Sequence, residues 1–286
     1  MMPPAVPYDA LTAIVPARNE ARTLSELLGQ LLEVVAEVRV VDDGSTDGTY
    51  DLAVDLVGAD RVCRNQSGRH GKGAAVTYGL QFVTTPLVVI QDADLEYAPS
   101  DLPQLAARFA APAGRRPLAV FGVRQPTAGT ARLVSEWGVR GLNSWAAACG
   151  GVRSRDHATC YKMLPTRLLR LLDAQAAGFD WCGEVCVKLG RLAAEASVLC
   201  DWQPLEEVDI SYTPRTADEG KKLRYRDGLT VAQTMWRSRD WSPGLSPDAL
   251  ARELDACRHE LDQAFGRTGT SEPVVSEPSV SEPAVA

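Results

Sequence analysis

The chain of 286 residues has no uninterrupted apolar run approaching the roughly 20 residues that a membrane span needs. Its N-terminus, Met1 to Ala10, lacks both a basic region and a long apolar core, so it does not resemble a signal peptide. The seven cysteines are odd in number and widely spread, which argues against a disulfide framework. Cysteines of this kind are typical of small buried hydrophobes in a reduced compartment, so we expect a cytoplasmic protein.

Basic residues are also in the minority. A formal net charge of -7 and a pI near 5.1 argue against a nucleic-acid backbone as the main partner. The fractions of hydrophobic residues, 45%, and of charged residues, 23%, are ordinary for a soluble globular protein. The length allows one large domain or two small ones with a substantial core.

An acidic cluster follows one apolar run. Val88 to Ile90 predicts a short buried strand, and Asp92, Asp94 and Glu96 come directly after it. If strand geometry persists through them, the alternate spacing points all three carboxylates to one side. A like-charge pair at about 4 Å near the surface costs on the order of 4 kcal/mol, and a divalent cation removes that cost. Oxygen ligands suit Mg²⁺ or Mn²⁺, so the cluster predicts a metal site, with a solvated turn as the alternative.

Strands alternate with helices along the first half, and polar residues follow the predicted strand ends. This order predicts an open, mostly parallel α/β sheet that binds its ligand outside the carboxyl ends of the strands. The residues expected at that edge are Glu20, Asp43, Asp92, Asp94 and Arg124. Expected strands cover residues 11–15, 38–41, 88–90 and 118–122 with a short one near Val62, and expected helices begin near Ala21 and cover 75–82 and 102–109.

The second half is less regular. We expect helices over 137–148, 164–172, 183–192 and 225–236, strands near Val198 and over 208–212, and a last helix that begins at Ser246-Pro247. The resulting divisions are an N-terminal extension (1–9), a main domain (10–240), a C-terminal helix (241–268) and a tail (269–286). The tail repeats Ser-Glu-Pro and lacks aromatic residues, so we expect it to be disordered.

The loop Gly71-Lys72-Gly73 approaches two nucleotide-binding motifs without completing either. Gln66 stands where a Walker loop has its first glycine, and Gly73 follows the lysine in place of Ser or Thr. Val76 stands where a dinucleotide fingerprint has its last glycine. Neither motif is therefore expected to bind a nucleotide here.

Four stretches together resemble the family 2 glycosyltransferases of GT-A fold. The most similar branch is that of dolichol-phosphate mannose synthase and the polyprenyl-phosphate sugar synthases. The stretches are Ile14–Glu20, Val41–Thr49, Gln91–Glu96 and Arg215–Lys221, and the resemblance covers residues 10 to 236 approximately. It implies a Rossmann-like, mostly parallel sheet flanked by helices in a single catalytic domain, with a donor half over 10–125 and an acceptor half over 126–240.

The resemblance implies a site for a nucleotide sugar and a divalent metal. Asp92 and Asp94 would hold the diphosphate through Mg²⁺ or Mn²⁺, and Glu96 occupies the position of a third ligand. Asp94 and Arg215 belong to the implied catalytic group. The substrate-binding residues are Pro16, Arg18, Glu20 and Asp43 around the base and ribose, Ala93 between the two aspartates, and Arg124, Arg215 and Lys221 around the phosphates. Metal and cations would stabilise the departing nucleoside diphosphate.

Two departures from the family pattern are visible. Arg18 stands where the family usually has a tyrosine that contacts the base. The C-terminal membrane helices of some relatives are absent from this sequence.

Asp156 matches an acceptor-side loop of the same branch and is the third implied catalytic residue. If the acceptor is a hydroxyl compound, Asp156 or Glu184 would serve as the general base, whereas an ionised phosphate needs none. A helix-cap role for Asp156 is the alternative, and His157 is interpreted as a loop residue.

The leading hypothesis is an inverting, metal-dependent transfer of a sugar from a UDP- or GDP-sugar to a polyprenyl phosphate. Basic residues on the helix from Gly220 to Arg239 favour a phosphate-bearing acceptor and a peripheral contact with the inner membrane face, with a solvated basic face as the alternative. The second acceptor hypothesis is a small-molecule hydroxyl compound in a secondary-metabolite pathway. A nucleotidyl transferase would need a Gly-rich basic loop after the first strand, which Pro16 to Glu20 is not. A binding protein with a degenerate site is opposed by the intact acidic cluster.

Overall fold

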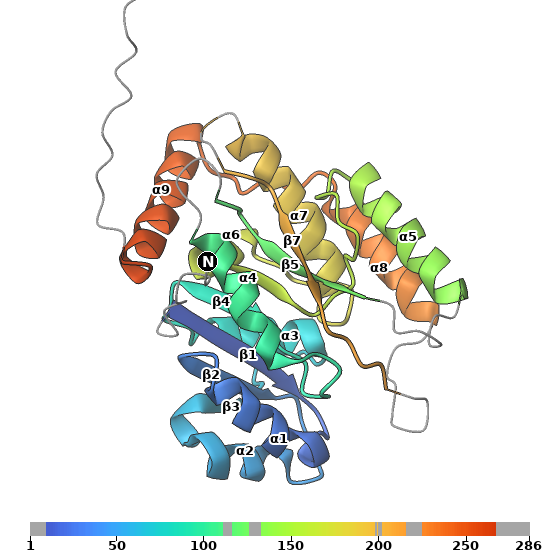
Figure 1. Cartoon of the computed structure of the whole chain (residues 1–286). Coiled ribbons are helices and arrows are strands. Elements are labelled where there is room, and N and C mark those ends of the chain that lie inside the picture. The colour runs from blue at the N-terminus through green and yellow to red at the C-terminus, as the bar shows by residue number, and fades with distance from the viewer. Residues whose placement is uncertain are drawn as a thin grey trace, which may run out of the picture.

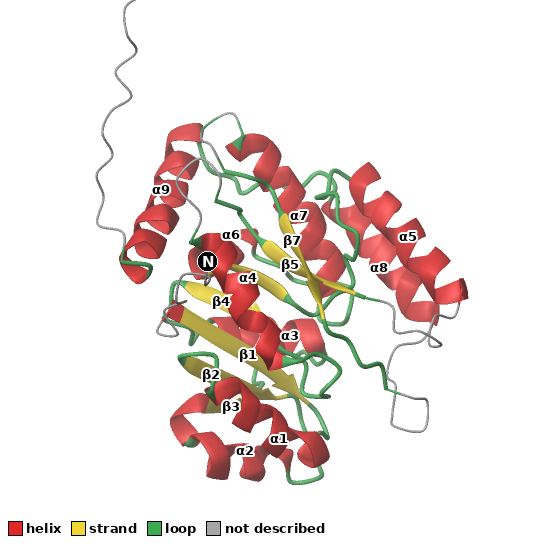
Figure 2. Ribbon diagram, viewed as in Figure 1, coloured by secondary structure: helices red, strands yellow, loops and turns green. Residues whose placement is uncertain are grey.

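The computed structural model describes residues 10–110, 116–125, 133–197, 199, 202–215 and 225–266. Its strands are β1 (Leu11–Ala17), β2 (Glu37–Asp42), β3 (Val62–Arg64), β4 (Leu87–Ile90), β5 (Val120–Arg124), β6 (Lys162–Pro165) and β7 (Glu206–Ile210). They form one seven-stranded sheet in the order β3-β2-β1-β4-β6-β5-β7. Figure 2 shows the strands in the middle of the molecule with helices on both sides.

The helices follow the strands in the expected alternation (Figure 1). They are α1 (Ala21–Leu32), α2 (Thr49–Val57), α3 (Lys72–Leu80), α4 (Leu102–Phe109), α5 (Leu133–Ala148), α6 (Thr166–Leu172), α7 (Trp181–Ala196), α8 (Tyr225–Ser238) and α9 (Pro247–Ala264). In α1 four leucines at helical spacing (Leu24, Leu27, Leu28 and Leu31) are buried, as an amphipathic surface helix requires, whereas Leu32 at its end is 43% exposed. The serine cap of α9 is confirmed, because the Ser246 hydroxyl accepts a hydrogen bond of 3.3 Å from the Ala249 N–H.

The expected mostly parallel α/β sheet flanked by helices is confirmed. β1 pairs in parallel with β2 and β4, β2 with β3, and β5 with β7. The exception is β6, which runs antiparallel to both β4 and β5. The central strands are buried throughout, which explains why they appear in the sequence as continuous apolar runs.

The strand β6 was not predicted, and the helix expected over 164–172 was placed two residues too early. β6 begins with Lys162, and a charged residue is not expected in a fully buried strand. Its ammonium group donates hydrogen bonds to the carbonyl oxygens of His157 and Thr159, at 2.7 and 2.6 Å. These hydrogen bonds offset the free-energy cost of burying the charge. The hydrophobic periodicity of the sequence does not indicate them.

One hydrophobic core cluster joins the two halves of the chain. It extends from Leu11 in β1 to Leu261 in α9, and includes buried side chains of the central strands and of α7. The helix α9 is therefore part of the core. Arg116, which precedes β5, also holds α9 by donating a hydrogen bond of 2.7 Å to Asp262.

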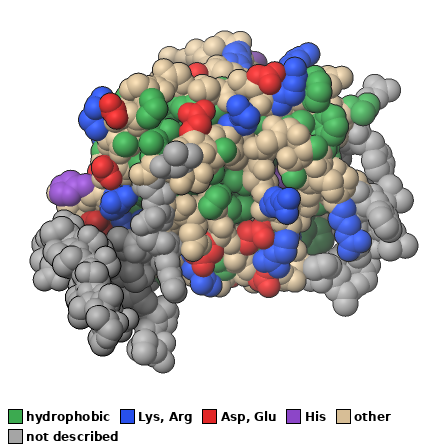
Figure 3. Space-filling view, turned by 90° about the horizontal axis from the view of Figure 1, so that it is seen from above, with side chains coloured by type: hydrophobic (Ala, Val, Ile, Leu, Met, Phe, Trp, Pro, Cys, Tyr) green, Lys and Arg blue, Asp and Glu red, His purple; other side chains and the backbone are tan. Residues whose placement is uncertain are grey.

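Several predictions fall on residues outside the described ranges. These are the N-terminal extension (1–9), the strand near Val198, the site residue Lys221 and the Ser-Glu-Pro tail (269–286). Among the helices of the described residues, none combines the length and the apolar character required to cross a membrane. Figure 3 shows acidic and basic side chains close to one another on the face seen from above.

The packing of α9 predicts a specific cost for opening a cavity there. Leu254 is 1% exposed, so Leu254→Ala should lower the free energy of unfolding by about 2–5 kcal/mol, measured by urea denaturation. Leu32→Ala is the matched control, because Leu32 is 43% exposed and its loss should cost about 0.5 kcal/mol. Equal stability of the two variants would show that α9 does not belong to the core.

Candidate functional site

The strand order creates a crevice at the carboxyl end of β1. Strands β2 and β3 lie on one side of β1, while β4 lies on the other, so the order of the sheet reverses at this point. In open α/β sheets this switch point is where ligands bind. The loop after β1, which contains Arg18 and Glu20, and the turn after β4, which contains Asp92 and Asp94, flank the crevice.

The acidic cluster lies on a turn and not on an extended strand. β4 ends at Ile90, and the chain reverses at Leu95, which has a positive φ of 60°. The prediction that strand geometry carries through Asp92, Asp94 and Glu96 is therefore wrong. Burial, then the neighbouring Asp92 and Glu96, raises the pKa of Asp94 to about 7. The carboxylates are thus crowded together without the alternation that the sequence suggested.

Glu96 faces the chain segment that follows β7. Its carboxylate accepts hydrogen bonds from the Tyr212 hydroxyl at 3.0 Å and from the Arg215 backbone N–H at 2.8 Å. Among the described residues, no group of three or more His, Cys, Asp or Glu is placed to hold a metal ion. The expected arrangement of three carboxylates around one ion is therefore not present in this structure.

Arg215 links the two loops that flank the crevice. Its Nε donates to the Asp94 carbonyl oxygen at 2.9 Å, and its Nη2 lies 3.1 Å from the Glu20 carboxylate. The Thr23 hydroxyl adds a second link, because it donates to the Ala93 carbonyl oxygen at 2.7 Å. The structure therefore brings the predicted residues Glu20, Ala93, Asp94 and Arg215 together.

Lys72 is a site residue that the sequence analysis missed. Its Nζ lies 2.6 Å from Oδ1 of Asp92, and both side chains are largely buried. Lys72 opens α3, so the helix brings a cation to the turn after β4. The signal in the sequence is a lysine between two glycines at the start of a helix, within the incomplete phosphate-binding motif of Gly71 to Gly73.

Arg124 and Asp156 form a second buried ion pair, on the acceptor side. Arg124 donates to both carboxylate oxygens, through Nε at 2.7 Å and Nη2 at 2.8 Å, and its guanidinium lies over the Tyr212 ring. Burial opposes ionisation, but the hydrogen bonds from Arg124 outweigh it and hold the pKa of Asp156 below its usual value. Asp156 lies in the loop between α5 and β6, so the helix-cap alternative is wrong. A carboxylate held this way is a weak general base.

Asp43 holds a loop in place beside the crevice. Its carboxylate accepts hydrogen bonds from Asn65 Nδ2 at 2.8 Å and from the Gly71 N–H at 2.7 Å. His70 Nδ1 lies 3.1 Å away, and the exposed Arg18 guanidinium approaches to 4.0 Å. Asp43 is thus heavily engaged, whereas Arg18 and His70 are exposed. Pro16 lies opposite Val41 near the carboxyl end of β1, at the same edge of the sheet.

Glu184 and His157 make contacts that stabilise the local structure. Glu184 accepts hydrogen bonds from the backbone N–H groups of Gln175 and Ala176, at 2.9 and 2.6 Å, and pairs with Lys188 at 2.8 Å. Both of its carboxylate oxygens are therefore engaged, unlike those of a ready base. His157 lies in the loop before β6, in contact with Asn143, and burial lowers its pKa to about 4.

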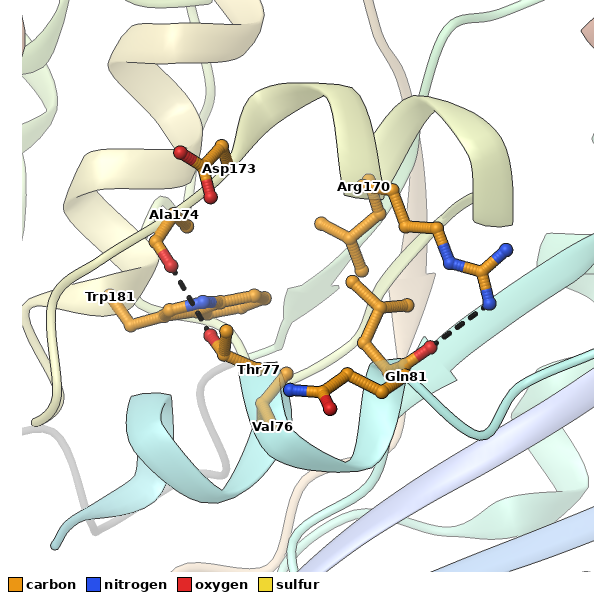
Figure 4. Close-up of a pocket in the computed structure, with 9 residues that line it drawn as sticks. Val76, Thr77, Gln81, Arg170, Asp173, Ala174 and Trp181 are labelled. Carbon is orange, nitrogen blue, oxygen red and sulfur yellow. Dashed lines mark hydrogen bonds between the residues drawn. The ribbon is translucent and has the colours of Figure 1, made fainter. Parts of the chain in front are cut away.

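A separate pocket of about 250 Å³ lies between α3, α6 and α7 (Figure 4). Val76 and Thr77 line it from α3 and Gln81 from the residue that follows this helix, while Trp181 and Arg170 face them. The Thr77 hydroxyl closes one end by donating to the Ala174 carbonyl oxygen at 3.2 Å. None of the residues predicted for the site lines this pocket.

The residues present fit a divalent metal at the turn after β4. Asp92 and Asp94 supply the oxygen ligands that Mg²⁺ and Mn²⁺ prefer. Burial, then the neighbouring Asp92 and Glu96, raises the pKa of Asp94, so a cation bound beside it would favour its charged form. Magnesium is commonly bound by one or two protein carboxylates with substrate phosphates completing its coordination. Two protein ligands are therefore a sufficient set.

The chain is similar to known proteins over most of its length. The model of glycosyl transferase family 2 matches residues 12–134. Uncharacterized glycosyltransferases of Mycobacterium tuberculosis and Mycobacterium bovis are 32% identical over 233 residues, which cover 78% of this chain and 94% of each relative.

Solved structures show the same fold. Glucosyl-3-phosphoglycerate synthase from Mycobacterium tuberculosis in complex with uridine diphosphate superposes with a TM-score of 0.60 and 19% identity, covering 82% of this chain and 81% of that enzyme. The same enzyme in complex with Mn²⁺, UDP-glucose and phosphoglyceric acid gives a TM-score of 0.58 and 20% identity over 82% and 81% of the two chains. A complex of that enzyme with Mg²⁺ and uridine diphosphate also has a TM-score of 0.58, with 20% identity over 82% and 80%.

The pairing of Arg124 with Asp156 predicts that Asp156→Asn destabilises the fold. An unpaired buried guanidinium should cost about 3 kcal/mol in urea denaturation at pH 7, and the double variant Arg124→Met/Asp156→Asn should recover part of that loss. Because the folded pKa of Asp156 is lowered, this stabilisation is present above the unfolded pKa and is lost as pH falls through the folded pKa. An Asp156→Asn variant of normal stability but with abolished turnover would identify Asp156 as a base instead.

Proposed function

Because the chain belongs to glycosyl transferase family 2, we propose that it transfers a sugar from a UDP-sugar to a small acceptor carrying an anionic group. Family membership makes the protein a glycosyltransferase that uses a nucleotide sugar. The base of the donor, the metal and the acceptor are the proposed parts. The observation that carries the proposal is the turn after β4, where Lys72 and Arg215 converge on Asp92 and Asp94 from distant parts of the chain.

The crevice has the charges that a nucleoside diphosphate requires. Lys72 and Arg215 approach the turn from α3 and from the segment after β7, so cations flank the position of a diphosphate. Glu20 orients the Arg215 guanidinium, which limits the reorganisation needed when charge develops on the leaving group. On the nucleoside side, the exposed Arg18 and His70 border the crevice near Asp43. The uridine base is supported by the structurally similar synthase, which binds UDP.

Asp92 and Asp94 would hold Mg²⁺ or Mn²⁺, which when bound supplies positive charge to the departing diphosphate. The similar synthase has been crystallised with each of these ions. Glu96 remains a prediction as a third ligand, because it would have to release Tyr212 and the Arg215 backbone. The roles of Pro16, Ala93 and Lys221 in donor binding also remain predictions.

An anionic acceptor is supported by a fixed cation on the acceptor side. Asp156 and Glu184 have both carboxylate oxygens engaged, so neither is a ready base, and the proton of an attacking hydroxyl would pass to the acceptor's own anionic group. Arg124, held by Asp156 at the end of β5, provides a fixed cation on the acceptor side. The similar synthase has been crystallised in complex with phosphoglyceric acid. We expect transfer to invert the configuration at the anomeric carbon. The anomeric proton coupling of the product measures this outcome.

A polyprenyl phosphate is the second candidate acceptor, favoured by an exposed apolar strip on α5 and α8. Leu229 is 70% and Trp236 50% exposed, and the Trp236 ring stacks on Trp145 with centroids 5.7 Å apart. Arg239 lies over the Trp236 ring at 3.9 Å. Helices α5 and α8 lie side by side at the edge of the molecule (Figure 1). Tryptophan and arginine side chains favour membrane interfaces, which would give peripheral contact with the inner membrane face.

The proposed function predicts metal-dependent transfer that depends on Asp94. With UDP-glucose, Mn²⁺ and a panel of phosphorylated hydroxy acids, Asp94→Asn should reduce UDP release by about a hundredfold, because the charge that binds the metal is lost. Asp255→Asn, on the exposed surface of α9, is the matched control and should retain full activity. Undiminished transfer by Asp94→Asn, or by the wild-type enzyme in excess EDTA, would refute the metal assignment.

The acceptors are separated in the same assay. Small phosphorylated acids should be glycosylated in free solution, whereas polyprenyl phosphate in anionic vesicles should not be. Preferential transfer to polyprenyl phosphate that is lost in a Leu229→Ser/Trp236→Ser variant would favour the second candidate.

A further inference from the structure

Lys72 places an ammonium group on a carboxylate that the proposed function assigns to the metal. The Nζ–Oδ1 distance to Asp92 is 2.6 Å, and the Lys72 side chain is 9% exposed. The aromatic ring of Phe179 is also close, with its centroid 5.9 Å from Nζ. The contact is therefore a sheltered ion pair, unlike the exposed pairs whose partners exchange freely with water.

The backbone around Lys72 is fixed from two sides. On one side, the Gly71 N–H donates to Asp43 at 2.7 Å, and on the other the Ala74 N–H donates to the Ala177 carbonyl oxygen at 3.0 Å. A Cβ at Gly71 would lie 2.5 Å from that same oxygen, and Gly71 has a positive φ of 123°. The two glycines around Lys72 therefore permit a close approach of the 176–177 segment, which sets where the lysine side chain begins.

A divalent cation and this ammonium group compete for Asp92. A metal bound at Asp92 would bring a second positive charge close to Nζ, and the repulsion between the two cations would weaken the contact of Nζ with Oδ1. Lys72 displaced into a sheltered site without a new partner would be an unpaired buried charge, which is strongly unfavourable. A diphosphate entering with the metal provides that new partner.

We propose that Lys72 is the resident counter-ion of Asp92 and is exchanged on donor binding, with Asp92 passing to the metal and Lys72 to the diphosphate. This inference rests on the proposed function, because it needs a metal and a diphosphate at this turn. It makes Lys72 a positioning residue that couples the two ligands. Metal alone meets the retained lysine, and nucleotide alone meets the carboxylates of Asp92 and Asp94, so each ligand strengthens the binding of the other.

The test is a titration of Mn²⁺, followed by the loss of its free electron paramagnetic resonance signal, with and without UDP. In the wild-type protein, UDP should strengthen Mn²⁺ binding by at least about tenfold. Lys72→Met should strengthen Mn²⁺ binding in the absence of UDP by about fivefold and reduce the effect of UDP. Arg108→Met, a change of the same charge on the exposed surface of α4, is the control and should leave both affinities unchanged.

A second variant covers the case in which Lys72→Met does not fold. Lys72→Arg keeps the charge and pairs with a carboxylate through two donors, so it should weaken Mn²⁺ binding without UDP by about fivefold. Thermal unfolding of each variant identifies those that are folded.

The outcomes distinguish this inference from the proposed function on which it rests. Tight Mn²⁺–UDP binding with metal-alone affinities that are the same in wild type, Lys72→Met and Lys72→Arg would overturn the counter-ion role and leave the glycosyltransferase proposal intact. Absence of Mn²⁺ binding in every protein, even with UDP, would overturn both.

Discussion

The crowding of carboxylates in the turn after β4 is the constraint on which the rest of the site depends. Asp92, Asp94 and Glu96 lie within five residues of one another in a largely sheltered turn. Each close like-charge pair costs on the order of 4 kcal/mol at an effective dielectric constant near 20. The fold offsets this cost with positive charge and hydrogen-bond donors from distant segments: Lys72 faces Asp92, while Arg215 and Tyr212 face the rest of the turn.

A buried polar network supports this turn from within the sheet. Gln91 is completely buried, donates to the Asp92 carbonyl oxygen at 3.0 Å and accepts a hydrogen bond of 2.7 Å from the Tyr161 hydroxyl. Tyr97 accepts a hydrogen bond from the Cys160 N–H at 3.1 Å, which joins the loop after the turn to the segment before β6. The segment before β6 therefore contacts the acidic turn from the sheet side, through Cys160 and Tyr161.

Local patterns in the sequence predict the framework of this site and not its charge pairing. The apolar runs Leu11–Val15 and Val38–Val41 are buried strands because both faces of a parallel sheet are covered, and the polar residues that follow them lie at one edge for the same reason. The partners of Asp43, Asp92 and Asp156 come from other elements, so no spacing in the sequence indicates them. The reversal at Leu95 was equally hidden, because a positive φ is uncommon for leucine and no glycine marks it.

The central claim is that the turn after β4 changes its cation from Lys72 to a metal when it receives a nucleoside diphosphate. Crystals grown with Mn²⁺ and UDP test it most directly, by anomalous diffraction at the manganese edge. The account predicts an anomalous peak shared by the carboxylates of Asp92 and Asp94, with the Lys72 ammonium moved from Asp92 to the diphosphate. A peak elsewhere, or UDP bound while Lys72 still contacts Asp92, would contradict it.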